Sequence, residues 1–514
     1  VNVNPDGMGQ VLLYPYYSAR GGNDTLISIV NTTERGKAVK IRFIEAINSR
    51  EVLDFNIYMS PYDVWTAVVT ATEEGGGKMI TSDTTCTVPY FYDAEAGFGE
   101  QAFLDFEYAL TGDDATVDGG PTGIDRTASG YIEVIEMGTL VETPAEEPEA
   151  GGSYVAWAVK HKGGVPNDCQ ALVNAWTDYG TTTPTAADTL AGAWLGDGTE
   201  TGFDTIQGAS GGMFGAASII NVADGTMFSY NATAIDGFFE DAGMSHTDPG
   251  SLFPSLSSGT NNTSIVFNNG KVETHTWGDI DEPNTIGAVN AVLMHNKIMN
   301  EYVTDAEVGA QTEWVVTMPT KRLHTDGLVA AIAPFTDSWV DVDDTACENF
   351  YFDYYDREEG PDFVEEEDPE VPPTPPVVSP KEPVDEDDPV VEEEIPEVVL
   401  CREASVIRFA SDASLPAASG ILKEPLRADD VFGYVNVEIT DFTSGWFSLD
   451  LGTDPDADTP RQMQASNGEY LQGLPVIGFA VTTYTNGNTG EGVLANYGGT
   501  FAHRATRAVS GSAN

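Results

Sequence analysis

Apolar and polar side chains alternate along several segments between residues 10 and 70, and this alternation limits the possible folds more than any other feature of the chain. Residues 38–44 and 52–59 show it most clearly. In the first segment one face carries Val39, Ile41 and Phe43, and the other carries Lys40 and Arg42. A period of two is typical of a β-strand with one buried face, and turn-forming residues between the segments favour antiparallel neighbours. We therefore expect a mainly β protein with antiparallel β-sandwich architecture, a few packed helices and a long acidic, Pro-rich loop.

The chain has 514 residues, more than one hydrophobic core usually organises, so we expect several packed units. The expected division is an N-terminal β-sandwich over residues 1–150, a β-rich region with helices over 151–355, an acidic Pro-rich loop or linker over 356–400, and strands over 401–514 that complete the sandwich body. Helical spacing of apolar residues predicts helices at about residues 168–179 and 284–303. Asn167 or Asp168 provides an N-cap for the first of them.

Acidic residues far outnumber basic ones: the chain has 82 Asp and Glu against 23 Lys and Arg, a formal net charge of -59. Such a charge repels nucleic acid and anionic membranes, so neither is expected as a partner. It also repels further copies of the chain. If copies associate, they do so through apolar or backbone contacts, or with divalent cations between carboxylates. No apolar stretch approaches the roughly 20 residues of a membrane helix, so no membrane insertion is expected.

Four cysteines, without any C-x-x-C pair, favour disulfides in an oxidising compartment over zinc or redox chemistry. Three pairings are possible. We favour Cys86 with Cys169 and Cys347 with Cys401, because each bridge then stays within one region; free buried thiols are the alternative. The chain begins at Val1 without a basic, hydrophobic leader, as expected for a mature chain after removal of a signal peptide, although a chosen chain boundary would look the same. We expect an extracellular or cell-surface protein.

Three carboxylates at alternating positions, Asp454, Asp456 and Asp458, form the best candidate metal site. Their spacing suits the oxygen-rich, flexible coordination of calcium, although the glycine and distal glutamate of an EF-hand loop are absent. A solvated acidic turn is the alternative. Asp341, Asp343 and Asp344 form a weaker second candidate.

Residues 208–212 fit the pattern G-x-S-x-G, with Ser210 in the nucleophile position. In hydrolases that pattern requires a preceding strand and a following helix. Here a Gly-rich loop and a strand flank it, so no catalytic serine is expected.

The first four residues, Val1, Asn2, Val3 and Asn4, form a short extended arm before a Pro-Asp-Gly turn signal. Such an arm can pair in its own sheet or in the sheet of a neighbour. Strand addition to a neighbour would let backbone hydrogen bonds overcome the charge repulsion between copies.

Several strand segments resemble a family of uncharacterised secreted or cell-surface proteins of Gram-negative bacteria. The segments are residues 11–17 (VLLYPYY), 29–32, 40–43, 52–56, 60–65 (SPYDVW), 314–322 and 473–479 (GLPVIGF). The resemblance covers most of the chain outside the acidic loop. It implies export and a surface location, and it brings no catalytic residues.

We therefore expect no enzyme but an extracellular structural subunit that assembles with its own copies into a cell-surface filament or layer, by strand addition through the N-terminal arm. The alternative is a monomeric surface module that binds glycans or calcium. A sugar platform could be formed by tryptophans, although most of them lie in strand or helix patterns and are expected in the core: Trp65, Trp157, Trp176, Trp277, Trp314 and Trp446. A hydrolase using Ser210 is a third hypothesis.

Overall fold

The structure is a computed structural model. It describes residues 1–111, 116–141, 154–177, 192–195, 205–240, 243–279, 282–339, 345–357, 397–426, 433–486 and 495–511. Most of the predicted acidic loop, residues 358–396, lies outside these ranges, as do Asp341, Asp343 and Asp344. Among the described helices, none is long and apolar enough to cross a membrane.

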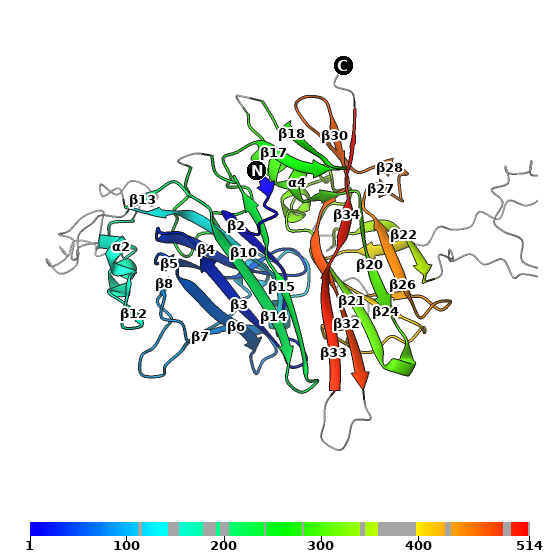
Figure 1. Ribbon diagram of the computed structural model, residues 1–514, viewed down its shortest axis with the longest axis horizontal. Helices are drawn as coiled ribbons and strands as arrows, with labels where there is room; N and C mark the ends of the chain where they lie inside the picture. Colours follow the sequence, from blue (N-terminus) through cyan, green and yellow to red (C-terminus); the bar gives the residue numbers. More distant parts are fainter. Residues whose placement is uncertain are drawn as a thin grey trace, which may run out of the picture.

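Two antiparallel sheets form the half of the molecule that contains the N-terminus (Figure 1). Sheet A runs in the order β1 (Asn2–Val3), β16 (Thr233–Asp236), β2 (Val11–Ser18), β10 (Ser129–Leu140), β4 (Lys37–Glu45), β5 (Glu51–Met59) and β8 (Cys86–Val88), with β13 (Ile206–Gln207) beside β10. Sheet B runs in the order β15 (Thr226–Asn231), β14 (Met213–Asn221), β3 (Asn23–Asn31), β6 (Val64–Ala71), β7 (Gly77–Thr81) and β9 (Gly99–Ala102). The inner faces share one core, in which Phe43, Phe55 and Trp65 are fully buried.

A second pair of sheets forms the other half. Sheet C runs in the order β23 (Glu397–Leu400), β22 (Glu348–Asp356), β26 (Ser444–Asp450), β20 (Lys297–Val303) and β34 (Arg504–Thr506). Sheet D runs in the order β25 (Val435–Glu438), β24 (Ala404–Ala410), β21 (Ala310–Thr317), β32 (Ile477–Asn486) and β33 (Ala495–Ala502), with β24 and β25 parallel. The expected mainly β, antiparallel, sandwich-like fold is confirmed.

Sheet D belongs to two cores at once. Trp314 and Val316 of β21 pack against sheet C, whereas Val315 between them joins the core of sheets A and B. The Thr317 hydroxyl donates to the backbone oxygen of Pro15 in β2 at 2.6 Å. The two halves are therefore packed against each other along sheet D.

Helices are few and short. α3 (Cys169–Ala175) begins where expected, because the Asp168 side chain accepts a hydrogen bond from the backbone N–H of Ala171 at 3.1 Å. The disulfide between Cys86 and Cys169 fastens this helix to β8, and the second disulfide joins Cys347 to Cys401; both are the pairings that the sequence favours.

The single helix predicted over residues 284–303 is wrong in its second half. α4 (Thr285–Leu293) ends after nine residues, and β19 (Met294–His295) and β20 follow. Arg507 satisfies the last carbonyls of α4, since its guanidinium donates to Ala291, Val292 and Met294. Residues 297–303 instead pair with β26 and β34. A residue more than 200 positions away thus caps the end of the helix, and local periodicity does not reveal it.

Candidate functional site

Charged side chains line the outer face of sheet A, and the fold buries them. On this face Lys40 Nζ lies 2.8 Å from Asp54 Oδ2. Lys37, on the same side of β4 as Val39, lies 2.8 Å from Glu136 Oε1 and is also buried. The Lys40 ammonium also donates to three backbone oxygens within residues 248–251, at 2.8 to 3.1 Å. Strand β4 therefore has two buried faces, where the sequence predicts one. Loops cover the second face, and this is tolerated because each buried charge has a partner.

Arg42, in the same strand, lies between two carboxylates. Its Nε and Nη1 donate to Glu51 Oε2 and Glu133 Oε2, both at 2.5 Å. Burial raises the pKa of Glu133, and burial together with the Glu51 carboxylate raises the pKa of Asp54 to about 7.

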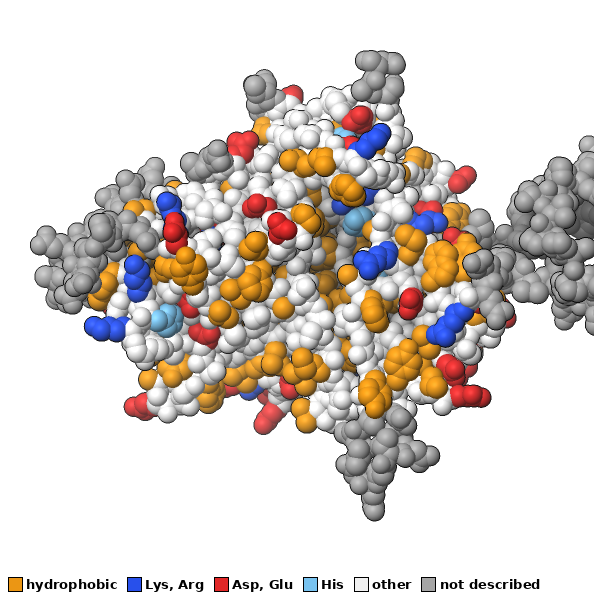
Figure 2. All heavy atoms as spheres, viewed as in Figure 1, with side chains coloured by type: hydrophobic (Ala, Val, Ile, Leu, Met, Phe, Trp, Pro, Cys, Tyr) orange, Lys and Arg blue, Asp and Glu red, His pale blue; other side chains and the backbone are white. Residues whose placement is uncertain are grey.

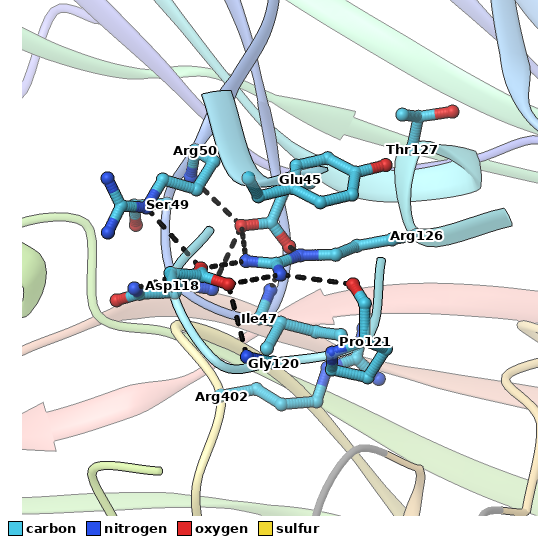
Figure 3. Close-up of polar contacts among 12 residues, drawn as sticks. Glu45, Ile47, Ser49, Arg50, Asp118, Gly120, Pro121, Arg126, Thr127 and Arg402 are labelled. Atoms are coloured by element: carbon cyan, nitrogen blue, oxygen red, sulfur yellow. Dashed lines mark hydrogen bonds and ion pairs between the residues drawn. The ribbon is translucent and has the colours of Figure 1, made fainter. Parts of the chain in front are cut away.

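The ion-pair network continues at the end of β4, around Arg126 (Figure 3). The Arg126 guanidinium donates to both carboxylate oxygens of Asp118, at 2.9 and 2.6 Å, and to Glu45 Oε1 at 3.0 Å. It also lies 4.2 Å from the ring centroid of Tyr108. Burial alone would raise the pKa of Glu45, but the Arg126 charge and three backbone N–H donors outweigh it and lower that pKa.

This network also connects the two halves of the molecule. The indole Nε1 of Trp339 donates to the backbone oxygen of Asp118 at 2.7 Å, and Arg50 Nη2 lies 3.0 Å from Asp326 Oδ1. These residues come from opposite sides of the contact between sheets A and D. Each charged group in this network pairs with another group of the protein. We call the network a structural joint, because it holds the two halves together.

Glu403 differs from these groups. Its side chain is fully buried, and neither carboxyl oxygen has a hydrogen-bond partner within the described residues. Burial raises the pKa of Glu403 to about 8, although the Lys321 ammonium acts in the opposite direction. Glu403 is therefore mostly neutral at pH 7.

The outer face of sheet B has the opposite character: it is open and carries uncharged side chains. Because strand pairing is in register, these side chains form rows across the sheet. One row is Ser229, Ser218, Leu26, Val68 and Ile80; the next is Asn231, Ala216, Ser28 and Thr66; the third is Phe214, Val30 and Val64. We call these three rows the uncharged face. Figure 2 shows mainly white and orange atoms over β3, β14 and β15.

Charged residues begin only at the margins of the uncharged face. Asp24 and Lys78 lie in the next row, and Glu100 lies on the edge strand β9. Leu26, in the middle of the five-residue row, is 43% exposed. A shallow hollow lined by Leu26, Val68, Ala216 and their neighbours lies on this face. In a chain of net charge -59, such a surface is the part that a second molecule can approach with least repulsion.

The predicted calcium ligands do not converge. Asp454 is buried in β27 (Thr453–Asp454), where its Oδ1 lies 3.6 Å from Arg461 Nη2. Asp456 accepts a hydrogen bond from the Asn349 amide at 2.8 Å, and Asp458 is exposed. Within the described part of the chain, no group of three or more acidic, His or Cys side chains is placed to hold a metal. Calcium binding stays a prediction from the sequence.

Ser210 does meet a lysine, which the sequence pattern does not predict. Its Oγ accepts hydrogen bonds from Lys37 Nζ at 2.9 Å and from the Thr139 hydroxyl at 3.1 Å, while Glu136 accepts from the backbone N–H groups of Ser210 and Gly211. A lysine paired with Glu136 is an ammonium, which has no lone pair to accept the serine proton. The group fixes the loop of residues 208–212 over sheet A.

The predicted assembly arm is part of its own fold. Asn2 and Val3 pair with β16, and the Val1 oxygen accepts a hydrogen bond from the Ile265 N–H at 2.8 Å. The Val1 side chain is buried. The arm thus has partners on both sides, from β16 and from β17 (Thr263–Asn268), so the expected strand addition by Val1, Asn2, Val3 and Asn4 does not describe this structure.

The uncharged face is the feature that sequence reasoning missed, although a signal for it exists. Residues 25–31, 64–71, 213–221 and 226–231 contain no Asp, Glu, Lys or Arg, whereas 20% of the whole chain is charged. Strands with one solvated face usually carry charged residues on it. A search for strand segments without charge would have found these four.

No family model matches the chain, and neither a curated protein nor a solved structure matches it. The resemblance to secreted or cell-surface proteins therefore stays an expectation from the sequence.

Proposed function

We propose that this protein is a structural subunit of an extracellular assembly and that two copies meet through the uncharged face. One observation carries this: the face combines open, uncharged rows with a chain whose remaining charge is strongly negative. Two copies that meet here bring no carboxylates together at the centre of the contact. The two disulfides support an oxidising, extracellular location.

The shape of the face suits a second sheet. Small and medium side chains such as Ser218, Ala216 and Val68 allow another sheet to pack at about 10 Å, as in a β-sandwich. Three rows over three to five strands cover roughly 20 Å by 20 Å, about 400 Å² per copy, which is less than the roughly 800 Å² per partner of a stable interface. Pairing through this face alone is therefore expected to be weak and concentration-dependent.

A layer or filament requires a second contact, because a face that meets itself closes into a pair. We propose that divalent cations between surface carboxylates supply it. A comparison of CaCl₂ with NaCl at the same ionic strength distinguishes bridging by divalent cations from general screening of charge. Larger particles with CaCl₂, lost on chelation, support bridging; equal sizes in both salts leave only charge screening.

The test of the pair uses Leu26, the middle residue of the longest row of the face. Leu26→Glu and Leu26→Lys are compared with Leu323→Glu, since Leu323 is also 43% exposed but lies on α5 (Arg322–Thr325). Sedimentation velocity over a wide concentration range should show self-association of the wild type and of Leu323→Glu, and monomers for both Leu26 variants. An equimolar mixture of the two Leu26 variants should associate again, because opposite charges then meet.

If Leu26→Glu associates as strongly as the wild type, the uncharged face takes no part in the assembly. A wild-type protein that stays monomeric at the highest concentration, with and without calcium, would reject the structural function altogether.

One observation favours a glycan-binding module as the second candidate. Trp446 is 39% exposed and stacks on Tyr355 with ring centroids 4.4 Å apart, next to Glu301 on the outer face of sheet C. Exposed aromatic rings beside carboxylates suit sugar rings and their hydroxyl groups. Retention on a polysaccharide column that Trp446→Ala abolishes would support this function over the first.

A further inference from the structure

The hairpin of β17 and β18 (Lys271–Thr276) lies next to the N-terminus, at the top of the view in Figure 1. Its two-residue turn, Asn269 and Gly270, has positive φ at both positions, 47° and 81°, as in the type I′ turn of a tight hairpin. Within the described residues, β17 is the only strand that pairs with β18. The other edge of β18 is therefore open.

The turn decides which backbone groups point to the open edge. In a two-residue hairpin the residues that flank the turn, here Asn268 and Lys271, form a hydrogen-bonded pair. Hydrogen-bonded and non-hydrogen-bonded pairs then alternate along the two strands. Val272 and Thr274 belong to the second kind, so their N–H and C=O groups point away from β17 and toward the open edge.

The open edge is short and accessible. At its far end the Thr276 oxygen accepts a hydrogen bond from the Ser466 N–H at 2.8 Å, which agrees with the alternation and closes the edge there. Between the turn and that point, the backbone groups of Val272 and Thr274 have no hydrogen-bond partner within the described residues. Val272 is 70% exposed. An exposed strand edge of this kind is a template for a further strand.

The side chains along this edge are self-complementary in one antiparallel register. When Val272 lies opposite the Val272 of a second copy, Lys271 lies opposite the partner's Glu273. Opposite charges directly across a strand pair stabilise it, and like charges destabilise it. In the neighbouring register, with Val272 opposite the partner's Thr274, the two Glu273 side chains face each other instead. Charge therefore favours the first register.

The apolar face of the hairpin fits the same pairing. Ile265, Phe267 and Val272 lie on one face, and each is exposed. Phe267 lies directly across β17 and β18 from Val272. In the paired ribbon the two Val272 side chains lie next to each other between the two Phe267 side chains, so part of this apolar surface leaves water.

We propose that two copies of the chain join through the open edge of β18, as antiparallel strands related by a twofold axis at Val272. The two Val272 residues then exchange both of their N–H···O bonds. The contact is much smaller than the roughly 800 Å² per partner of a stable interface, so by itself it leaves mostly monomers in solution. It does not depend on the uncharged face. With that face, it gives each copy two separate contacts, as an open chain of copies requires.

A disulfide trap detects such a weak contact. In the proposed register the Cα atoms of the two Val272 residues are about 5.5 Å apart, which a disulfide can bridge. Lys271→Cys and Glu273→Cys are the controls, because residues 271 and 273 lie about 8 Å from their own copies across the axis, too far for a disulfide. Under mild oxidation of the full chain, Val272→Cys should form cross-linked dimers at least about fivefold faster than either control. Non-reducing gels measure the rates, and the four native cysteines are already paired.

Charge reversal tests the register. In the Val272→Cys background, Lys271→Glu and Glu273→Lys each place like charges opposite one another, so each should slow cross-linking about fivefold. The two changes together should restore the rate, because opposite charges meet again. Leu26→Glu in the same background should leave the rate unchanged. The thermal melting of each variant checks that it is folded.

A Val272→Cys variant that cross-links no faster than Lys271→Cys would overturn the contact. Fastest cross-linking by Glu273→Cys, or no recovery in the double charge reversal, would overturn the register. Loss of cross-linking on addition of Leu26→Glu would overturn its independence from the uncharged face.

Discussion

Sheets A and B share one core, yet their outer faces are built in opposite ways. On sheet A the outer face carries Lys40 and Arg42, and both side chains are buried and paired with carboxylates. On sheet B the outer face carries Leu26, Ser28, Val68 and their uncharged neighbours, and it is open. Both faces differ from the usual arrangement, in which charged side chains are exposed and apolar side chains are buried, because charged groups prefer water and apolar groups avoid it. The polarity of each face therefore depends on what packs against it: other parts of the chain on sheet A, and solvent or a second molecule on sheet B.

The buried charges of sheet A pair with other groups of the same chain. A buried ion pair contributes little net stability, because the loss of hydration offsets much of the attraction. Its partners nevertheless depend on each other strongly, since removing one leaves the other charged and unpaired. The uncharged face of sheet B has no such internal dependence. Substitutions on the two faces should consequently differ in kind.

The largest effect is expected at Arg126. Arg126→Met leaves the buried carboxylates of Asp118 and Glu45 without their main partner, so the free energy of unfolding should fall by about 3–5 kcal/mol. Urea unfolding followed by fluorescence measures this. Lys78→Met, which breaks the exposed pair of Lys78 and Glu100 on sheet B, is the control and should cost no more than about 1 kcal/mol.

A triple variant sharpens this prediction. Adding Glu45→Gln and Asp118→Asn to Arg126→Met removes the unpaired charges, so most of the lost stability should return. If the triple variant is as unstable as Arg126→Met, packing around Tyr108 rather than charge dominates this joint.

The second effect concerns Glu403, a buried acid without the partners found on sheet A. Its pKa is raised by burial from 4.5 to about 8 in the folded protein. The folded state therefore holds the proton more tightly, so this contribution is fully present below pH 4.5 and is lost as the pH rises toward 8. Glu403→Gln mimics the neutral acid and should leave stability at pH 4.5 nearly unchanged.

At pH 8 the same variant should be more stable than the wild type by a few kcal/mol, on the order of 1.4 kcal/mol for each unit of pKa shift and less after solvent relaxation. Unfolding in urea at pH 4.5, 6 and 8 follows the difference. A difference that does not grow between pH 4.5 and pH 8 would show that Glu403 is ionised in the folded protein and paired with Lys321.

The same two faces show how far the sequence can be read. The alternation of Val39, Ile41 and Phe43 predicts the inner face of β4, because period two follows directly from strand geometry. The burial of Lys40 is not predictable from the pattern, since the loop that covers it comes from distant residues 248–251. The sequence alone does not distinguish a lysine in a strand that is solvated by water from one that is surrounded by three carbonyl oxygens.

The candidate site was hidden for a different reason. The uncharged strands of sheet B are visible in the sequence, but an absence of charge on alternate positions resembles an ordinary buried strand. Only the strand order, in which β14 and β15 join β3 after 180 residues, places their neutral positions in common rows. The end of α4 was not predicted for the same reason: the residue that caps it, Arg507, is remote in sequence.

The smallest effect on folding is expected on the uncharged face itself. Leu26→Glu and Leu26→Lys place a charge in water on an open face, so the free energy of unfolding should change by less than about 0.5 kcal/mol at concentrations where the protein is monomeric. Urea unfolding of the dilute protein measures this. The result decides how the association test is read, because loss of association then reflects the surface and not a damaged fold. A loss of about 2 kcal/mol or more would mean that Leu26 supports the sandwich core, and the contrast between the outer faces of sheets A and B would no longer separate folding from assembly.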